Sequence, residues 1–417
     1  MKKAKLLIMN KFRSFIVVLL VLQISACTDD SKNQSKVNLL QLDDFIIRSI
    51  QKGSDNAVIC TGFYEKLDDF VVLEYNEDLN FQRKTQLNGL AKFNGSVKLL
   101  SLQENGYLIS CFISSDVPQR LMLYKTDPDF NITKEVQVSS WNNAESKTNV
   151  RQLIELKNGD ILMAFDTMGI SPKFSGFVFQ RFDKDLETLF RYADNIMPNT
   201  GGFSPRIVEL EDESLFYVIA TSHADIGGPF KSIRSGRLSK AGASLFSNFT
   251  SKQEPLLAPV GLSLMNNKLV YEVLINQEVL HFMTFDIETG GILLDQEMSY
   301  NEVNHFNQYG AFVNQYPFTL LVAQTIGEAN SFSSHGTQSQ GHVLYSKATS
   351  SLFMSTVNDQ LIPSVAFNVQ LPAFDQVKSY RQLYQNDGNV LVAVSYDYLG
   401  ESYFNLQKLD LNGKVVE

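Results

Sequence analysis

The sequence of 417 residues predicts an all-β fold made of about seven repeated units, each with four strands. Three observations support this fold class. A polar turn followed by an apolar strand recurs along the chain, a second turn follows it about 25 residues later in most units, and no long segment has helical periodicity. A repeat architecture also explains how the chain exceeds the size at which a single compact core stops growing.

The first marker of the repeat is typified by Asn105-Gly106-Tyr107-Leu108-Ile109, in which a polar turn leads into an apolar strand. Its copies start at Asp55, Asn105, Asn158, Glu213, Asn266, Tyr316 and Asp387. The steps between these positions are 50, 53, 55, 53, 50 and 71 residues, so only the last step is long. The spacing therefore predicts seven units.

The second marker is a strand with alternating apolar residues that ends in an acidic turn. The clearest copy ends in Lys408-Leu409-Asp410-Leu411-Asn412-Gly413, and the turns at Asp127 and Asp183 are similar. Asp at the start of a turn supplies side-chain hydrogen bonds, and Asn-Gly supplies positive φ angles. Each unit is thus predicted as strand, tight turn, strand, longer loop, strand, tight turn and strand.

Four strands per unit, repeated without helices, are the pattern of a β-propeller. The units resemble the blades of bacterial propeller proteins that carry an Asp-Gly turn, as at Asp387-Gly388, and a Lys-x-Asp-x-x-Gly turn, as at 408–413. The resemblance covers most of residues 40–417, although the WD dipeptide and the glycine pair of kelch blades are absent. A pair of β-sandwiches is the alternative fold, but it leaves the even spacing unexplained.

The N-terminal segment has the order of charges and apolar residues that is typical of a secretory signal peptide. An apolar run at 15–22 follows five basic residues and no acid, namely Lys2, Lys3, Lys5, Lys11 and Arg13. A membrane-spanning helix needs about 20 apolar residues, so this run is too short to remain as a spanning anchor.

The residues Ile24-Ser25-Ala26-Cys27 resemble the bacterial lipobox, although that family usually has leucine in place of Ile24. The resemblance implies cleavage before Cys27, acylation of Cys27 with chains such as palmitate, and anchoring in the outer membrane, on the periplasmic side or at the cell surface. Asp29-Asp30 resembles the surface signal of some Bacteroidota lipoproteins. The alternative is an ordinary secretory signal beside an incidental cysteine.

The predicted organisation is a signal peptide at 1–26, a lipidated polar tether at 27–40 and a propeller domain at 41–417. Loss of the signal peptide leaves 31 basic and 45 acidic residues, a net charge near −14. Such a surface repels phosphate backbones, so nucleic acid is not an expected partner.

Neither a metal nor a cofactor is expected. Cys60 and Cys111 lack metal-site spacing and lie in apolar runs, which predicts core residues; a disulfide between them stays an open alternative. Asp127-Pro128-Asp129-Phe130-Asn131 begins like a calcium loop but lacks the glycine and the distal Glu, so a turn is predicted.

The variable loops are predicted at the end of each blade opposite the tight turns. They correspond to 114–120, 167–174, 221–230, 325–340 and 396–402. Because binding residues are usually placed on loops of a rigid scaffold, His223, Asp225 and Tyr398 are candidate ligand-binding residues. The alternative is that these loops only cover the ends of the blades.

Cations recur on the predicted innermost strands at nearly one level of the propeller. They are Arg48, Lys98, Arg151 and Arg206, with Arg381 one position out of phase. A ring of cations around the central channel would attract a carboxylate, a phosphate or an acidic loop of a partner. The alternative is that each cation pairs with a neighbouring acid or carbonyl group and joins adjacent blades.

Sequence motifs for catalysis are absent, since the chain has no GxSxG, HExxH, Walker loop or repeated Asp-box. We therefore expect a lipid-anchored binding or scaffold protein of the cell envelope, with another envelope protein or a glycan or peptide ligand as its partner. The alternatives are a hydrolase or lyase that acts on polysaccharide and a structural subunit of an outer-membrane assembly. The sequence leaves the question of catalysis open, because propellers serve all three roles.

Overall fold

The computed structural model of the protein describes residues 38–42, 45–53, 56–64, 70–87, 97–113, 120–138, 147–168, 176–195, 200–223, 230–252, 256–265, 268–275, 279–298, 306–308, 318–325, 349–357, 367–368, 376–385, 387–410 and 414–416. Residues 1–37 belong to a separate unit. The predicted signal peptide and Cys27 therefore lie outside the described residues. No helix in the described part of the chain is long and apolar enough to cross a membrane.

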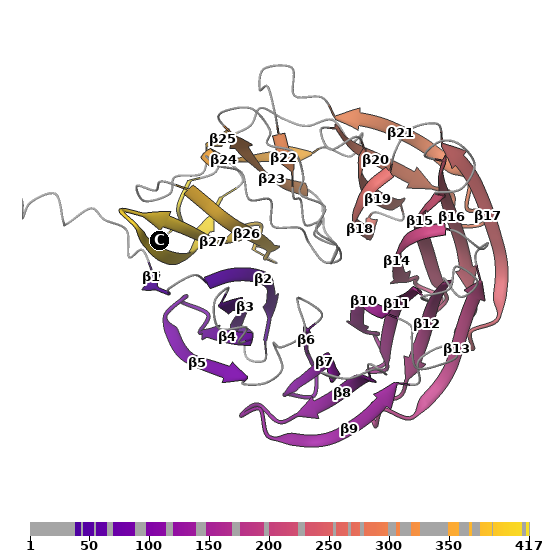
Figure 1. Ribbon diagram of the computed structural model, residues 1–417, viewed down its shortest axis with the longest axis horizontal. Helices are drawn as coiled ribbons and strands as arrows, with labels where there is room; N and C mark the ends of the chain where they lie inside the picture. Colours follow the sequence, from indigo (N-terminus) through magenta and orange to yellow (C-terminus); the bar gives the residue numbers. More distant parts are fainter. Residues whose placement is uncertain are drawn as a thin grey trace, which may run out of the picture. The chain divides into compact units, whose positions relative to one another are not determined.

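Seven antiparallel sheets of four strands each form the unit that spans Asn38–Val416 (Figure 1). Blade 1 contains β2 (Phe45–Lys52), β3 (Val58–Tyr64), β4 (Phe70–Tyr75) and β5 (Phe81–Leu87). Blade 2 contains β6 (Lys98–Ser101), β7 (Tyr107–Ile113), β8 (Arg120–Thr126) and β9 (Ile132–Val138). Blade 3 contains β10 (Lys147–Glu155), β11 (Ile161–Met168), β12 (Gly176–Phe182) and β13 (Thr188–Asn195).

Blade 4 contains β14 (Thr200–Glu209), β15 (Leu215–His223), β16 (Phe230–Leu238) and β17 (Ser244–Lys252). Blade 5 contains β18 (Leu256–Met265), β19 (Lys268–Ile275), β20 (Val279–Phe285) and β21 (Ile292–Met298). Blade 6 contains β22 (Phe306–Gln308), β23 (Phe318–Thr325), β24 (Thr349–Val357) and β25 (Phe367–Asn368). Blade 7 contains β26 (Gln376–Tyr384), β27 (Val390–Tyr398), β28 (Glu401–Leu409) and β1 (Asn38–Gln41).

This arrangement confirms the predicted all-β propeller with seven blades. The sheets surround a common centre, and in blades 1 to 5 the first strand lies innermost and the fourth outermost (Figure 1). The long step of 71 residues in the repeat arises in blade 6, where 326–348 separate β23 from β24. An insertion between two strands changes the spacing of the sequence repeat without adding a blade.

The hydrophobic core lies between neighbouring blades. One cluster joins Val58 and Val71 of blade 1 to Leu391 and Phe404 of blade 7, and further clusters join blades 1 and 2, 2 and 3, 3 and 4, and 4 and 5. β12 is covered on both faces, so all seven of its residues are buried, including the polar Gln180 and Arg181. The outermost strand β5 instead alternates between exposed and partly buried residues.

The tight turns follow the chemistry that the sequence predicts. In the turn after β8, the backbone N–H of Asp127 donates to the carbonyl oxygen of Asn131 at 3.0 Å. The Asp127 carboxylate accepts the backbone N–H groups of Asp129 and Asn131, both at 2.9 Å. The predicted turn at this motif is therefore confirmed. In blade 3, Gly159 supplies the positive φ of 86° that its turn requires.

An N-terminal strand completes the last blade. β1 pairs with β28 in antiparallel register, from Asn38 opposite Leu406 to Gln41 opposite Tyr403. The propeller unit therefore begins at Asn38, and residues 38–40, which the sequence analysis assigned to the tether, belong to blade 7. The sequence repeat does not reveal this strand because β1 lies in a different part of the chain from the rest of its blade.

The segment 396–402 differs from the predicted variable loop. Leu399 and Gly400 form a two-residue turn with φ angles of 52° and 81°, so 396–402 is a strand–turn–strand segment and not a long loop.

Cys60 and Cys111 are both buried free thiols. They are core residues and form no disulfide.

Candidate functional site

The tight-turn end is the end of each blade that carries the first and third turns. Near this end, four blades have a cation in their third strand. It stands two residues before the first residue of the third turn, as Lys125, Arg181, Arg237 and Lys408. Three of these side chains reach the third turn of the next blade, and all four lie within 4.0 Å of an acidic group in the first turn of their own blade. The contacts join adjacent blades at this end.

Arg181 is the most buried of these cations, with 6% of its side chain exposed. Its Nε donates to Oδ2 of Asp160 at 2.8 Å, and its Nη1 donates to the backbone carbonyl oxygen of Lys240 at 3.0 Å. Asp160 belongs to the same blade, whereas Lys240 lies in the third turn of blade 4. One guanidinium group therefore holds two turns of two blades together.

The same pattern recurs with different partners. Arg237 donates to Oδ2 of Asp212 at 2.6 Å in its own blade and to Oε1 of Glu288 at 3.0 Å in blade 5. Lys125 donates to the backbone carbonyl oxygen of Lys184 in blade 3 at 2.8 Å. In blades 2, 3 and 4 the cation of the third strand therefore joins its blade to the next one, whereas the ion pair of Lys408 lies within blade 7.

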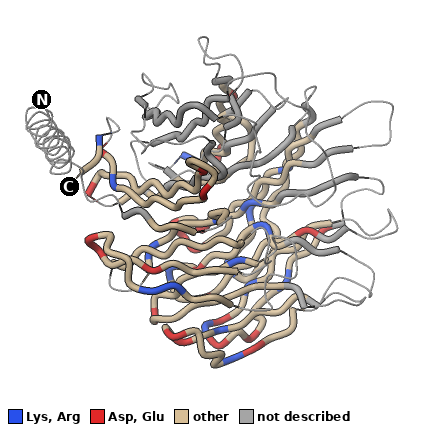
Figure 2. Tube along the Cα trace, turned by 60° about the vertical axis from the view of Figure 1, so that its left-hand side comes forward, with Lys and Arg blue, Asp and Glu red and all other residues tan. Residues whose placement is uncertain are grey.

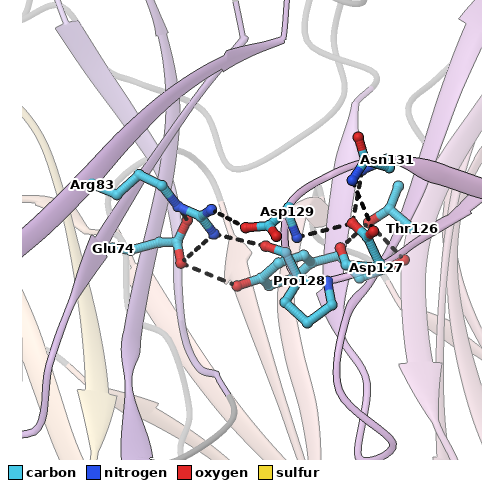
Figure 3. A network of polar contacts seen from close by, with 8 residues as sticks. Glu74, Arg83, Thr126, Asp127, Pro128, Asp129 and Asn131 are labelled. Carbon is cyan, nitrogen blue, oxygen red and sulfur yellow. Dashed lines mark hydrogen bonds and ion pairs between the residues drawn. The ribbon is translucent and has the colours of Figure 1, made fainter.

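Blade 1 contacts blade 2 through a network in which the charges are exchanged: an acid stands at the position of the cation, and the cation comes from the fourth strand (Figure 3). Glu74 occupies the position of the cation, and Arg83 of β5 donates to its two carboxylate oxygens at 2.7 and 3.0 Å. Arg83 also donates to Oδ1 of Asp129 and to the carbonyl oxygen of Pro128, both at 2.7 Å. Its guanidinium lies 5.6 Å from the centre of the Phe130 ring. Hydrogen bonds to Glu74, opposed by burial, raise the pKa of Arg83.

The charges described at the tight-turn end are therefore largely used in contacts within and between blades. Sequence reasoning missed Arg83, Arg181 and Arg237 as interblade residues. The available signal for Arg181 and Arg237 was the recurrence of Lys or Arg two residues before the third turn in blades 2, 3, 4 and 7; Arg83 of β5 lies outside this pattern. A cation at a fixed place in a repeat is expected to meet the same neighbour in each copy.

The predicted inner-strand cations occupy two registers that differ by one residue. Arg48 and Arg151 are the extra residues of β-bulges, where β2 and β10 shift register against β3 and β11. Lys98, Arg206 and Arg381 are instead regular ladder positions, opposite Ser110, Val218 and Ala393. The five residues occupy nearly the same height on their strands, but they are not equivalent, because bulges re-aim side chains.

The two bulge arginines contact the same relative position of the second strand. Arg151 donates from Nε and Nη2 to the two oxygens of Asp166, at 3.0 and 2.8 Å. Asp166 is fully buried, and 11% of the Arg151 side chain is exposed. In blade 1 the equivalent partner is aromatic: the Arg48 guanidinium lies 4.5 Å from the centre of the Phe63 ring.

Arg206 lies beside the Arg151–Asp166 pair and links blade 4 to blade 3. Its Nη1 donates to the carbonyl oxygen of Pro205 at 3.2 Å and to that of Arg151 at 3.5 Å. The pKa of Arg206 is lowered to about 10, mainly by burial and also by the charge of Arg151, while Tyr271 and Asp166 oppose the shift. Arg206 thus stays protonated at neutral pH, and these three charged groups carry a net charge of +1.

The other predicted site residues are only partly placed. Lys98 is the first residue of β6, Tyr398 is the last residue of β27 beside the two-residue turn, and His223 is the last residue of β15. The side chains of His223 and Arg381 and the whole of Asp225 lie outside the described residues. The structure therefore brings Arg151 and Arg206 together, and ligand binding by the eight residues stays a prediction.

The inner-strand cluster of Arg151, Asp166 and Arg206 can hold an anionic group by charge, in a protein whose overall charge is negative. The buried hydroxyl group of Tyr271, on β19 of blade 5, has no hydrogen-bond partner among the described residues. No group of three or more His, Cys, Asp or Glu side chains suited to a metal ion occurs in the part of the chain that the structure describes.

Comparisons with known proteins concern the fold. No family model matches the chain, and no curated protein matches it in sequence. The polysaccharide lyase Uly1 has a similar structure, with a TM-score of 0.53 and 8% sequence identity over 88% of this chain and 90% of that one. The propeller domain of the Trilobed protease from Pyrococcus furiosus has a TM-score of 0.47, with 10% identity over 89% and 97% of the two chains.

A third similar structure is an α-L-arabinanase from Penicillium chrysogenum in complex with arabinobiose. Its TM-score is 0.43, with 13% identity over 91% of this chain and 99% of that one. At such identities, similarity extends to the architecture, and function has to be argued from the residues of this chain.

Proposed function

We propose that the protein is a lipid-anchored binding protein of the bacterial cell envelope and that it engages its partner with the loop-rich end of the propeller. The loop-rich end is the end of the blades that carries the second turns and the links between blades. The observation that carries the proposal is the difference between the two ends. The tight-turn end repeats one interblade network, whereas the second turns range from two residues in blade 7 to 23 residues, 326–348, in blade 6.

The anchor part of this proposal rests on the sequence. The basic segment, the short apolar run and the lipobox-like residues before Cys27 support export and acylation. Several acyl chains on one cysteine hold a protein to a bilayer almost permanently, since each buried methylene contributes about 0.8 kcal/mol. In this proposal the acyl chains anchor the protein in the outer membrane.

The inner-strand cluster supports an anionic group on the ligand. Arg151 is neutralised by Asp166, and Arg206 adds a positive charge beside this pair. In this proposal a carboxylate or phosphate of the ligand interacts with Arg206, while His223, Asp225 and Tyr398 at the loop-rich end contact the rest of the ligand. Arg48, Lys98 and Arg381 are the other inner-strand cations that this proposal assigns to the ligand.

Affinity capture from detergent-solubilised membranes tests this function. The lipidated full-length protein is expected to recover a specific envelope protein, or to select a glycan or peptide ligand in a binding screen. A variant with Arg206→Gln is expected to recover less of that partner, while Lys240→Gln at the tight-turn end serves as a matched control. Failure to recover any specific partner protein, together with no glycan or peptide ligand in the binding screen, would argue against a binding role.

The polysaccharide-acting hydrolase or lyase remains the alternative, and the same preparation distinguishes it. Turnover of a glycan that is abolished by His223→Ala or Arg206→Ala would establish catalysis and replace the binding proposal. Co-purification of the protein in fixed stoichiometry with an outer-membrane complex would instead indicate a structural subunit.

A further inference from the structure

The outermost strand of blade 4, β17, has an edge and a face that suit pairing with a second copy of the same chain. We propose that β17 pairs with β17 of a second molecule in an antiparallel ladder centred on Ser247, which makes the protein a two-fold symmetric dimer. This inference goes beyond the proposed function, because it concerns contact between copies of the chain and does not depend on acylation of Cys27.

β17 ends the sheet of blade 4 and lies on the outer rim of the propeller (Figure 1). It pairs with β16 on its inner side, from Lys231 opposite Lys252 to Leu238 opposite Ser244. Among the described strands, none pairs with the outer edge of β17. The outward-facing backbone N–H and C=O groups of such an edge strand are available to a strand of another chain.

β17 also carries less charge than the corresponding strands of other blades. Residues 244–251 contain no charged side chain, and only Lys252 at the end of the strand is charged. The fourth strands of blades 1, 2, 3 and 5 each contain two charged residues, namely Arg83 and Lys84, Lys134 and Glu135, Arg191 and Asp194, and Asp295 and Glu297. Charges on an edge strand oppose pairing with another chain, and β17 lacks this protection.

Two large apolar side chains of β17 are exposed to solvent. Leu245 is 55% exposed and Phe249 is 57% exposed. Exposed and half-buried residues alternate from Leu245 to Thr250, so Leu245, Ser247 and Phe249 lie on the exposed face of the strand. A second strand that pairs with this edge would bring its own side chains beside these three.

The half-buried residues of β17 hold the strand in place. Phe246 packs against the apolar cluster that joins blades 4 and 5, and Nδ2 of Asn248 donates to the carbonyl oxygen of Thr289 in blade 5 at 3.4 Å. Oγ of Ser247 accepts a hydrogen bond from Nε of Arg234 at 2.8 Å. Because the strand is already extended and held, pairing costs little ordering of the chain.

The spacing of the two exposed apolar residues indicates a second copy as the occupant of this edge. Leu245 and Phe249 are four residues apart, with Ser247 midway between them. In a two-fold antiparallel ladder through Ser247, Leu245 of each copy lies opposite Phe249 of the other. An interface between two identical surfaces requires this self-complementarity, and apolar pairs across strands stabilise a sheet. The ladder covers 244–250, so it excludes Lys252.

Charge also favours contact between copies at this strand. The chain has a net charge of −9, so two copies repel each other in general. Lys and Arg residues are interspersed with Asp and Glu residues along the described part of the chain (Figure 2). Beside β17, Arg234 forms an ion pair with Asp194, and Arg237 forms ion pairs with Asp212 and Glu288. The uncharged edge therefore allows approach with little repulsion.

Cysteine crosslinking tests the register of the ladder. Residues opposite each other in an antiparallel ladder have Cα atoms about 4.5 to 5.5 Å apart, which is within the range of a disulfide. The full-length Cys27→Ser protein with Ser247→Cys is expected to form a disulfide-linked dimer under mild oxidation in the cells that produce it. The native Cys60 and Cys111 are buried and do not compete.

The matched control for crosslinking is Glu135→Cys, which is exposed at the equivalent position of β9 in blade 2. This variant is expected to remain monomeric on a non-reducing gel. Equal crosslinking from positions 135 and 247, or a disulfide from position 247 to a different protein in place of a second copy, would overturn the proposal.

Sedimentation of the purified full-length Cys27→Ser protein measures the affinity of the dimer. Phe249→Lys places a charge in the ladder on both copies and is expected to raise the dissociation constant more than about tenfold. Gln137→Lys, at the equivalent exposed position of β9, is expected to leave the dissociation constant unchanged. A monomer at every concentration before either lysine is introduced, or equal dissociation constants for the two lysine variants, would overturn the proposal.

Discussion

Arg181 and Lys240 form a contact between two blades: the Nη1 group of Arg181 donates to the backbone carbonyl oxygen of Lys240 at 3.0 Å. The Nε group of the same side chain donates to Oδ2 of Asp160 at 2.8 Å, so a contact within blade 3 holds the guanidinium in place for its contact with blade 4. The acceptor is a main-chain atom, so the sequence at position 240 is free to vary. The contact therefore depends on the fold of the turn more than on its side chains.

Arg181→Met is expected to lower the free energy of unfolding by about 3 kcal/mol, because it leaves the partly buried Asp160 carboxylate without its counter-ion. Chemical denaturation at neutral pH measures the change. The control is Lys184→Met, whose side chain is 62% exposed and is expected to contribute less than about 0.5 kcal/mol. Equal small effects of the two substitutions would contradict the structural role of Arg181.

Asp166→Asn is expected to destabilise the protein by about 3 to 5 kcal/mol, since Arg151 would keep its charge in a buried position without a carboxylate. The double variant Arg151→Met with Asp166→Asn removes both charges and is expected to recover most of this loss. A double-mutant cycle from denaturation curves gives the coupling energy. Additive effects of the two single changes would show that the pair is not coupled.

Asp387 predicts a loss of stability in acid. Burial opposes ionisation of this carboxyl, but hydrogen bonds from Lys408 and Asn389 prevail and lower its pKa from 3.8 to about 2. A lowered pKa stabilises the folded state above the unfolded pKa, so this contribution is complete above about pH 4 and is lost as pH falls toward 2. The free energy of unfolding, measured across this pH range, should fall less steeply for Asp387→Asn than for wild type. Parallel curves for the two proteins would contradict the assignment.

Cys60 and Cys111 are expected to be unreactive in the folded protein. Burial raises the pKa of the Cys111 thiol to about 12 and that of Cys60 still higher, so the nucleophilic thiolate is scarce at neutral pH. In the Cys27→Ser protein, a maleimide reagent should label neither cysteine before denaturation and both afterwards. Labelling of only one after denaturation without reductant would indicate oxidation of the other.

The blade count was predictable because each blade contributes one copy of the same turn and strand. The positions of Asn105, Asn158 and Asp387 therefore mark blades directly. The closure of blade 7 was not predictable from this signal, since β1 at Asn38–Gln41 has no turn partner adjacent in sequence. Pairing between chain segments that are far apart leaves little local pattern.

The candidate site was predictable only in part. The level of Arg151 and Arg206 followed from their distance to the first turn, but a bulge places Arg151 one residue out of the ladder on which Arg206 lies. A one-residue shift moves a side chain to the other face of a strand. Asp166, the partner of Arg151, had no distinguishing sequence signal because it belongs to an otherwise apolar run.

The difference in role between the two ends of the propeller is tested most directly by site-specific crosslinking in intact cells. A photoreactive amino acid is placed at Asp225, between β15 and β16 at the loop-rich end, or at the exposed Asp185 in a tight turn of blade 3. The account predicts a specific crosslinked partner from position 225 and none from position 185. A partner captured from position 185 and none from position 225 would contradict it.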